Sequence, residues 1–435
     1  MYEIAEDAVK ELKKYGSEFE IFIEKEEVIE LNSKKSVLNF AKDENNFGIG
    51  IRVIENNKVG FAYTSNPKDI SKVIKQAFSN SKLNEKDENF SFAEQGQKYK
   101  KVKGIFDSKF NKKTDLDKGI DFINTLLNTV KDEKCEATSA NFYAISSNNL
   151  IVNSNDLSVE NSGTGFTGSL AVNADKGGEK STAYDSISSC VFDLNGEKLG
   201  NDVCKLAKDS IGGINIETGN MDVILDYNAA SGLLSSFISS FSADNVQRSQ
   251  SHLKGKEGSK IVSEDLSIYD DGIYESGLSS SISDGEGTSS QKTILVKEGI
   301  LENFIHNIYT ANKDNVKSTG NGLRTSYLST PINMNSNVIF DFKNSIDISE
   351  IDNGFLATDV LGAHTANPVS GDFSVEANNS FLIENGEITK PVKKAMISGN
   401  IFKGLEDSQA VKSDIKQYGS FIIPKILSKN LNIIG

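Results

Sequence analysis

The chain has 435 residues and a formal net charge of −14 at pH 7, with 47 Lys and Arg residues against 61 Asp and Glu residues. This length predicts two or three domains with a sizeable core. A duplex-binding protein normally presents a basic stripe to the phosphates, and none is present, so direct nucleic-acid binding is not expected. The only arginines are Arg52, Arg248 and Arg324, which we attribute to a general preference for lysine.

The start of the chain and its cysteines favour a cytoplasmic protein. The first sixteen residues have the charge pattern of an amphipathic helix rather than that of a signal peptide. No apolar run approaches the ~18 residues that a membrane span needs. Cys135, Cys190 and Cys204 are odd in number and far apart, which argues against a disulfide framework and favours buried structural thiols in a reducing compartment.

Residues 1–82 are predicted to form a helix, a small antiparallel sheet and a second helix. Apolar residues between Ile4 and Leu12 share one helical face, and Gly16 is a typical stop. Asn66 before Pro67 is a typical start for the second helix. Alternating apolar residues predict strands at 18–31, 36–42, 46–54 and 58–64, with a hairpin turn inside 54–60.

Residues 83–113 show no hydrophobic period and are interpreted as a connection, in which Tyr99 to Val102 could form a short strand. A second region, 114–213, follows. Its first helix would be capped by Thr114 or Asp115, and its last helix covers 197–209. The strands predicted between these helices cover 135–145, 149–154, 157–173 and 181–193.

Residues 214–435 are predicted to form a mostly antiparallel β domain with a central helix. A buried strand ends at Leu225, and a helix covers Ser231 to Phe241, with serines on its less apolar side. The pairs Glu298-Gly299 and Asn385-Gly386 are typical hairpin turns, and 420–434 is the closing strand. The fold class is therefore α+β, with small antiparallel sheets flanked by helices in the N-terminal region.

Three groups of residues could carry chemistry, and each has a structural alternative. The histidines His252, His306 and His364 lack a metal-binding spacing. The acidic residues Asp270, Asp271, Asp284 and Glu286 could form a carboxylate site, but acidic residues beside glycine usually shape turns. Serines 235–240 lack a GxSxG elbow, so a packed helix is favoured over a nucleophile.

Several segments, taken together and in order, resemble the PmbA/TldD family, long associated with modulation of DNA gyrase. They are SIYDDG (267–272), SDGEGTSSQKTILVKEGIL (283–301), NFIHNIYTAN (303–312), STGNGLR (318–324), GAHTANPVSGDFSV (362–375) and FLIENGEI (381–388). The resemblance covers essentially the whole chain and is weakest in residues 1–110. It implies one of two kinds of subunit: a TldD type with a zinc-peptidase motif, or a PmbA/TldE type without it.

The residues at the family's metal positions imply the second type. The TldD type carries His-Glu-x-x-x-His on the central helix and a Gly-x-Cys near the C-terminus. In this chain the two histidine positions correspond to Ser235 and Ser240, the glutamate position to Ser236, and no cysteine follows Cys204. Serine is a poor zinc ligand and a poor base. The resemblance therefore implies no catalytic residue and no cofactor in this chain, with zinc only in a TldD-type partner.

The family behaviour implies a heterodimer that degrades or trims unstructured peptides. In it, this chain would supply walls of the substrate chamber and dimer surface, or would pair with itself when the partner is absent. Residues 321, 364, 367 and 372 (Asn321, His364, Asn367 and Asp372) are the candidate peptide contacts, with loop stabilisation as their alternative role. Two other functions stay open: an independent hydrolase, and a protein-binding modulator of DNA gyrase.

Overall fold

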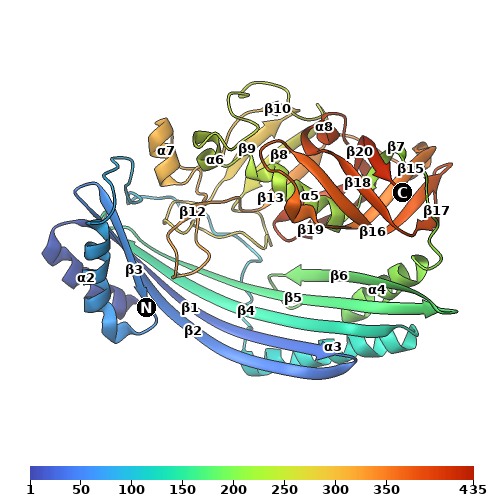
Figure 1. Cartoon of the computed structure of the whole chain (residues 1–435). Helices are drawn as coiled ribbons and strands as arrows, with labels where there is room; N and C mark the ends of the chain where they lie inside the picture. Colours follow the sequence, from blue (N-terminus) through green and yellow to red (C-terminus); the bar gives the residue numbers. More distant parts are fainter.

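The computed structural model describes residues 1–435 and confirms the α+β fold class. It has an N-terminal part built on one long curved sheet and a C-terminal part above the concave side of that sheet (Figure 1). The N-terminal part contains α1 (Tyr2–Leu12), η1 (Lys13–Tyr15), β1 (Glu18–Lys34), β2 (Val37–Glu55), β3 (Lys58–Thr64), η2 (Pro67–Asp69), α2 (Ile70–Ser81), α3 (Lys112–Asp132), β4 (Glu136–Asn153), β5 (Ser158–Lys176), β6 (Glu179–Ser189) and α4 (Gly196–Asp209).

The six N-terminal strands form a single antiparallel sheet in the order β3-β2-β1-β4-β5-β6. The strands predicted for residues 1–82 and for 114–213 thus join one sheet instead of separate small ones. The predicted pairs 36–42 with 46–54, and 135–145 with 149–154, are each one continuous strand, β2 and β4. The polar middle of β2 stays extended because it pairs with β1, and that of β4 because it pairs with both β1 and β5.

Alternation along β1 decides which face of this sheet meets which partner. Odd-numbered residues such as Ile21 and Ile29 are buried under helices: α1 and α2 cover one end of the sheet, and α3 and α4 cover the other. Even-numbered residues such as Glu20 and Glu24 point to the opposite face, toward the C-terminal part. That face carries the residues that join the two parts.

Two local predictions are wrong. Asn111, not Thr114 or Asp115, caps α3, because its side chain accepts the Thr114 amide hydrogen. No strand forms at Tyr99–Val102. The hairpin turns at Glu298-Gly299 and Asn385-Gly386 are confirmed, since all four residues have positive φ.

The C-terminal part is a twelve-stranded sheet whose path closes on itself. It contains β7 (Gly219–Leu225), α5 (Tyr227–Ser239), α6 (Ala243–Gln247), β8 (Leu266–Asp271), β9 (Lys292–Lys297), β10 (Ile300–Leu301), α7 (Ile308–Asp314), β13 (Val338–Phe342), β14 (Ser345–Ile346), η3 (Ile348–Glu350), β15 (Asn353–Leu361), η4 (Ala363–Thr365), β16 (Asp372–Glu384), β17 (Glu387–Val392), β18 (Ala395–Asn400), α8 (Ile401–Glu406), β19 (Gln409–Tyr418) and β20 (Phe421–Ile434). A separate two-stranded ribbon pairs β11 (Gly322–Leu323) with β12 (Ile332–Asn333).

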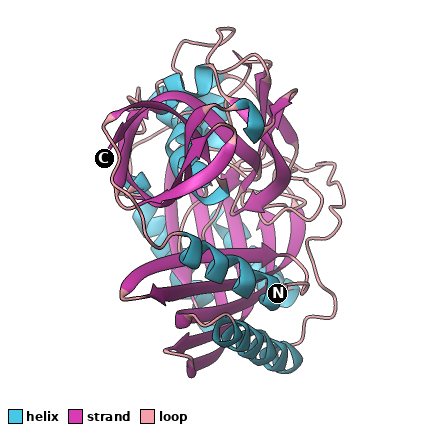
Figure 2. Ribbon diagram, turned by 90° about the vertical axis from the view of Figure 1, so that its right-hand side faces the viewer, coloured by secondary structure: helices cyan, strands magenta, loops and turns pink.

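Five strands, β7-β15-β16-β18-β20, form a ring because β20 pairs with both β18 and β7; its curved strands are visible in Figure 2. Helix α5 packs against β15, β20 and β7, and its Leu233, Leu234 and Phe237 are fully buried in the largest core cluster. The helix begins at Tyr227, earlier than the predicted Ser231. Asp226 caps it and accepts the Tyr227 amide hydrogen.

No helix of the structure is both long enough and apolar enough to cross a lipid bilayer.

Candidate functional site

The serine hydroxyls at positions 235, 236 and 240 each donate to a backbone carbonyl. The hydroxyl of Ser235 donates to the Ser231 carbonyl at 2.8 Å, and that of Ser236 donates to the Leu233 carbonyl at 2.9 Å. Ser240 is fully buried and donates to the Pro368 carbonyl at 3.3 Å. Hydroxyls used in this way satisfy backbone carbonyls and present no ligand set for a metal. The side chains at these three positions therefore do not fit a zinc ion.

Three of the predicted peptide-contact residues lie in one loop that covers α5. The loop 362–372 approaches the helix at Gly232, where an added Cβ would lie 3.3 Å from the Cβ of Ala363. His364, Asn367 and Asp372 are exposed on this loop. The Asn367 side chain accepts the Val369 and Ser370 amide hydrogens, so it shapes the loop while remaining accessible.

Asp372 ends the same loop and is held by neutral donors. Asn400 and Ser370 donate to its carboxylate, both at 2.8 Å, and these two hydrogen bonds lower the pKa of Asp372. Asn321, the fourth candidate, lies elsewhere. It is 1% exposed and donates to the Asp270 carboxylate and the Met334 carbonyl. Asn321 therefore stabilises the core and offers no surface to a peptide.

The histidines do not meet. The ring of His252 stacks on Phe402 with centroids 4.0 Å apart, and burial together with Lys256 lowers its pKa. His306 is buried in a different segment, and burial lowers its pKa too. Nowhere in the structure do three or more His, Cys, Asp or Glu side chains gather closely enough to hold a metal ion.

A closed ionic cluster joins the two parts of the molecule. Arg52 of β2 donates to Glu20 of β1 at 2.8 Å and to Glu286 at 3.4 Å, and Arg324 also pairs with Glu20. All four side chains are less than 10% exposed. Arg324 further donates to the Gly285 carbonyl at 2.7 Å. Glu286 and Arg324 come from the C-terminal part, so we call this group the interdomain cluster.

Asp284 lies beside the interdomain cluster and shapes a turn, as the sequence suggested. Its carboxylate accepts the amide hydrogens of Glu286, Thr288 and Gly322 at 2.8 to 2.9 Å. Burial raises the pKa of Asp284, and the neighbouring Glu286 raises it further. The Asp284 carboxylate therefore stabilises a turn of the backbone. Glu286, in the same segment, also forms an ion pair with Arg52.

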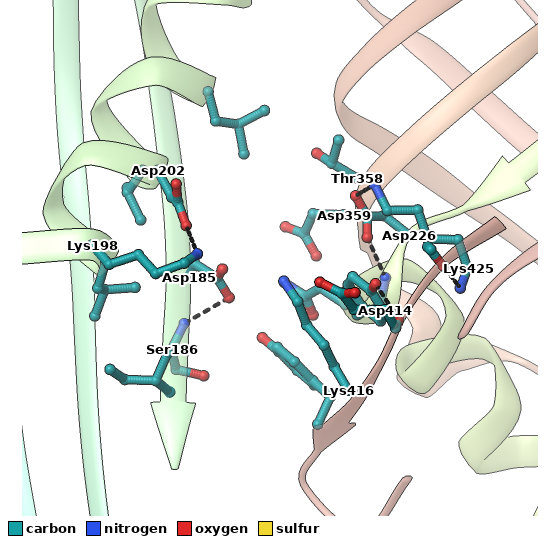
Figure 3. A pocket seen from close by; sticks show the side chains of 18 of the residues that line it. Asp185, Ser186, Lys198, Asp202, Asp226, Thr358, Asp359, Asp414, Lys416 and Lys425 are labelled. Atoms are coloured by element: carbon teal, nitrogen blue, oxygen red, sulfur yellow. Dashed lines mark hydrogen bonds and ion pairs between the residues drawn. The ribbon is translucent and has the colours of Figure 1, made fainter. Parts of the chain in front are cut away.

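An open cleft of about 1270 Å³ lies between the β6 end of the sheet and the C-terminal ring (Figure 3). Its walls come from β6, α4, the start of α5, β15 and β19. Its charged side chains are Asp185, Asp193, Asp202, Asp209, Asp226, Asp359 and Asp414, together with Lys198, Lys205, Lys412, Lys416 and Lys425. Burial raises the pKa of both Asp185 and Asp359, although Lys416 lowers that of Asp185, and neither carboxylate forms an ion pair.

This cleft was not predicted from the sequence. Its charged residues are dispersed between positions 184 and 425, and each resembles an ordinary solvated aspartate or lysine. The one local signal was β6 itself, whose polar residues between Tyr184 and Ser189 do not show the alternation of a half-buried strand. Only the fold brings these segments together.

Comparison with known proteins identifies the family of the chain. Sequence profiles of the PmbA/TldA metallopeptidase domains match three segments: domain 1 over residues 19–81, the central domain over 109–211 and the C-terminal domain over 218–435. The chain belongs to the PmbA/TldD family. A relative from Methanocaldococcus jannaschii without an assigned function is 36% identical over 98% of both chains. A second protein of that organism, described as a metalloprotease, is 26% identical over 85% of this chain and 84% of its own length.

Solved structures agree with this assignment. The crystal structure of TldE from Thermococcus kodakarensis aligns over 99% of this PmbA/TldD chain and 100% of its own, with a TM-score of 0.91 and 26% identity. A Thermotoga maritima protein, described as a proposed modulator of a DNA gyrase, covers 99% of both chains with a TM-score of 0.89 and 26% identity.

Proposed function

We propose that this chain is the non-catalytic, TldE-type subunit of a cytoplasmic heterodimeric zinc metalloprotease that degrades or trims unstructured peptides. In this proposal, zinc and the catalytic base belong to a TldD-type partner, and this chain contributes dimer surface and part of the substrate chamber. The observation that carries the proposal is the state of α5: the family's metal positions hold Ser235, Ser236 and Ser240, and each hydroxyl binds a backbone carbonyl.

Neutral hydroxyls cannot supply what the hydrolysis requires. A catalytic zinc needs imidazole, thiolate or carboxylate ligands and an adjacent general base. The side chains that surround α5 include His252 and His364, but His252 is stacked on Phe402 and the chain gathers no third ligand. The TM-score of 0.91 to a protein named TldE supports the same subunit type.

The test is co-expression with a TldD-type chain of the same organism. We expect the purified chain alone to contain no stoichiometric zinc and to cleave no fluorogenic peptide. We expect cleavage to appear when the two chains co-purify. A matched variant with Ser235→Ala and Ser236→Ala should leave the activity of the mixture unchanged, because neither hydroxyl takes part in the chemistry.

The opposite pattern would overturn the proposal. If the isolated chain bound one zinc per molecule and cleaved peptide, and if Ser235→Ala or His364→Ala abolished that cleavage, the chain would be an independent hydrolase.

A further inference from the structure

Strand β6 has one free edge. It is the last strand of the N-terminal sheet and pairs only with β5. The pairing has no register shift, so alternate residues direct their backbone groups to β5 and to the open side. The carbonyl of Thr182 is bound by Asn379 of β16, and the amide hydrogen of Ser186 is bound by the Asp185 side chain. Even-numbered residues therefore face the open side.

By this alternation, Tyr184, Ser186 and Ser188 present backbone groups to the cleft. The Ser186 amide hydrogen is already satisfied by Asp185, whereas no protein group binds the Tyr184 or Ser188 amide hydrogen. An exposed strand edge with free donors and acceptors is a template for one more strand. The cleft of about 1270 Å³ exceeds the range of about 300–1,000 Å³ usual for small-molecule sites, which favours an extended chain as occupant.

The cleft residues without an ion-pair partner determine which ligand charge is favoured. Lys198, Lys205 and Lys425 are each used in an ion pair with Asp202, Asp209 and Asp226 respectively. Four aspartates and two lysines remain without an ion-pair partner, and Lys416 lies over the Tyr227 ring at 4.5 Å. The unpaired carboxylates exceed the unpaired ammonium groups, so the cleft has an excess of negative charge toward a bound ligand.

We propose that the β6 edge binds a segment of extended, lysine- or arginine-containing polypeptide as an added antiparallel or parallel strand, with Asp185 and Asp359 on opposite walls receiving its cationic side chains (Figure 3). The backbone pairing supplies affinity without regard to sequence, and the carboxylates supply a preference for basic residues. This inference rests on the proposed peptide-handling role and assigns that role a location outside α5.

The test measures binding of a labelled peptide to the purified full-length chain by fluorescence anisotropy. The probe is an unstructured Lys-Thr repeat of about eight residues, a common strand length, and the comparison probe has Glu in place of Lys. Ser188→Pro removes the free donor from the edge while leaving the β5 ladder intact. We expect Ser188→Pro to weaken binding of the Lys probe at least about tenfold. The matched control Ser188→Ala keeps the donor and should bind within about twofold of the wild type.

Two further measurements keep the proposal testable if Ser188→Pro folds poorly. In the wild-type chain, the amide hydrogens of Tyr184 and Ser188 should gain protection from exchange when the Lys probe is added. Asp359→Asn should reduce the preference for the Lys probe over the Glu probe by about three- to tenfold. Absence of binding, equal affinity for Ser188→Pro, or unchanged exchange at both amides would overturn the proposal.

The two proposals fail in different experiments. If the co-purified mixture cleaves peptide and Ser188→Pro changes neither binding nor cleavage, the β6 site is wrong and the subunit role stands. If the mixture is inactive but the isolated chain binds the Lys probe at β6, the edge site stands and the protease role is wrong.

Discussion

The interdomain cluster and the open cleft both lie between the N-terminal sheet and the C-terminal part, and both are rich in charge, but they treat that charge in opposite ways. In the cluster, Arg52 and Arg324 are enclosed and pair with Glu20 and Glu286. In the cleft, Asp185 and Asp359 form no ion pair. The contrast depends on the position in the sheet. The charged side chains form ion pairs where the C-terminal part covers β1 and β2, and several remain without an ion pair beside the open edge at β6.

The difference shows how charged residues attach the two parts to each other at one end of the sheet and leave a ligand-accessible surface at the other. A buried charge is stable only when its partner is held in place, and arginine suits this because its planar fork binds two acceptors at once. A solvated lysine such as Lys416 has no such requirement and stays free to respond to a ligand.

Removing one arginine of the cluster should cost the most. Arg324→Ala leaves the Glu20 carboxylate buried with one cation fewer, and we expect the free energy of unfolding to fall by about 3–5 kcal/mol. Chemical denaturation measures this. Arg248→Ala is the matched control, because Arg248 forms only an exposed pair with Asp244 on α6, and its loss should cost less than about 0.5 kcal/mol. Equal losses for the two variants would contradict the distinction.

Glu24, at the rim of the interdomain cluster, should make the stability of the fold depend on pH. Burial raises the pKa of Glu24 from 4.5 to about 7, although its carboxylate accepts the Tyr327 amide hydrogen at 3.1 Å. Between these two pKa values the folded chain keeps a proton that the unfolded chain has lost. The contribution of Glu24 to stability is therefore complete below pH 4.5 and declines as the pH rises to about 7.

Glu24→Gln should remove this pH-dependent part of the free energy of unfolding. Because Glu24 is not fully enclosed, screening limits the expected difference to on the order of 1 kcal/mol. Denaturation curves of both proteins across the interval measure it. A wild type whose stability rises over that interval relative to Glu24→Gln would contradict the assignment.

In the cleft, ion pairs should be worth less than in the cluster. Lys425 donates to Asp226, the cap of α5, at 2.9 Å, and both side chains are partly exposed. Lys425→Ala should lower the free energy of unfolding by about 0.5–1 kcal/mol, because water can replace the lost ammonium group. A loss as large as that of Arg324→Ala would show that the cleft is structurally closed.

The smallest effect is expected at the outer wall of the cleft. Lys198 pairs with Asp202 one turn away on α4, and both are largely exposed. Lys198→Ala should change stability by less than about 0.5 kcal/mol, measured by the same denaturation curves. High salt should reduce even this difference, whereas the cost of Arg324→Ala should persist in salt because its charges are buried.

Local patterns predicted much of this fold. The helix stop at Gly16 is confirmed by its φ of 66°, and the two C-terminal hairpin turns and the final strand lie where the sequence placed them. The length of β2 was not predicted because its polar middle stays extended only by pairing with β1. The residues of β2 alone do not reveal that pairing. The cap of α3 was misplaced by three or four residues, since Asn111 caps the helix in place of Thr114 or Asp115.

The candidate site was less predictable than the fold. The serines at positions 235, 236 and 240, which are poor metal ligands, can be identified from the sequence alone, and so can the adjacent loop with His364 and Asn367. The cleft forms only because β6, α4 and β19 lie close together in the fold. Local sequence patterns do not predict which distant elements come together. The positions of the arginines could have indicated the interdomain cluster. Two of the three arginines in this lysine-rich chain lie in the cluster, and a general preference for lysine does not explain why arginine is retained there.

The closure of the C-terminal ring has a consequence for biosynthesis. Strand β7 pairs with β20, so Gly219 lies opposite Ile433. During translation β7 leaves the ribosome roughly 200 residues before its ring partner, and α5 emerges with an apolar surface that nothing yet covers. The N-terminal sheet can assemble while synthesis continues, but the C-terminal part must wait for the last strand. In that interval Leu233 and Phe237, which are fully buried in the finished fold, lack the strands that later cover them.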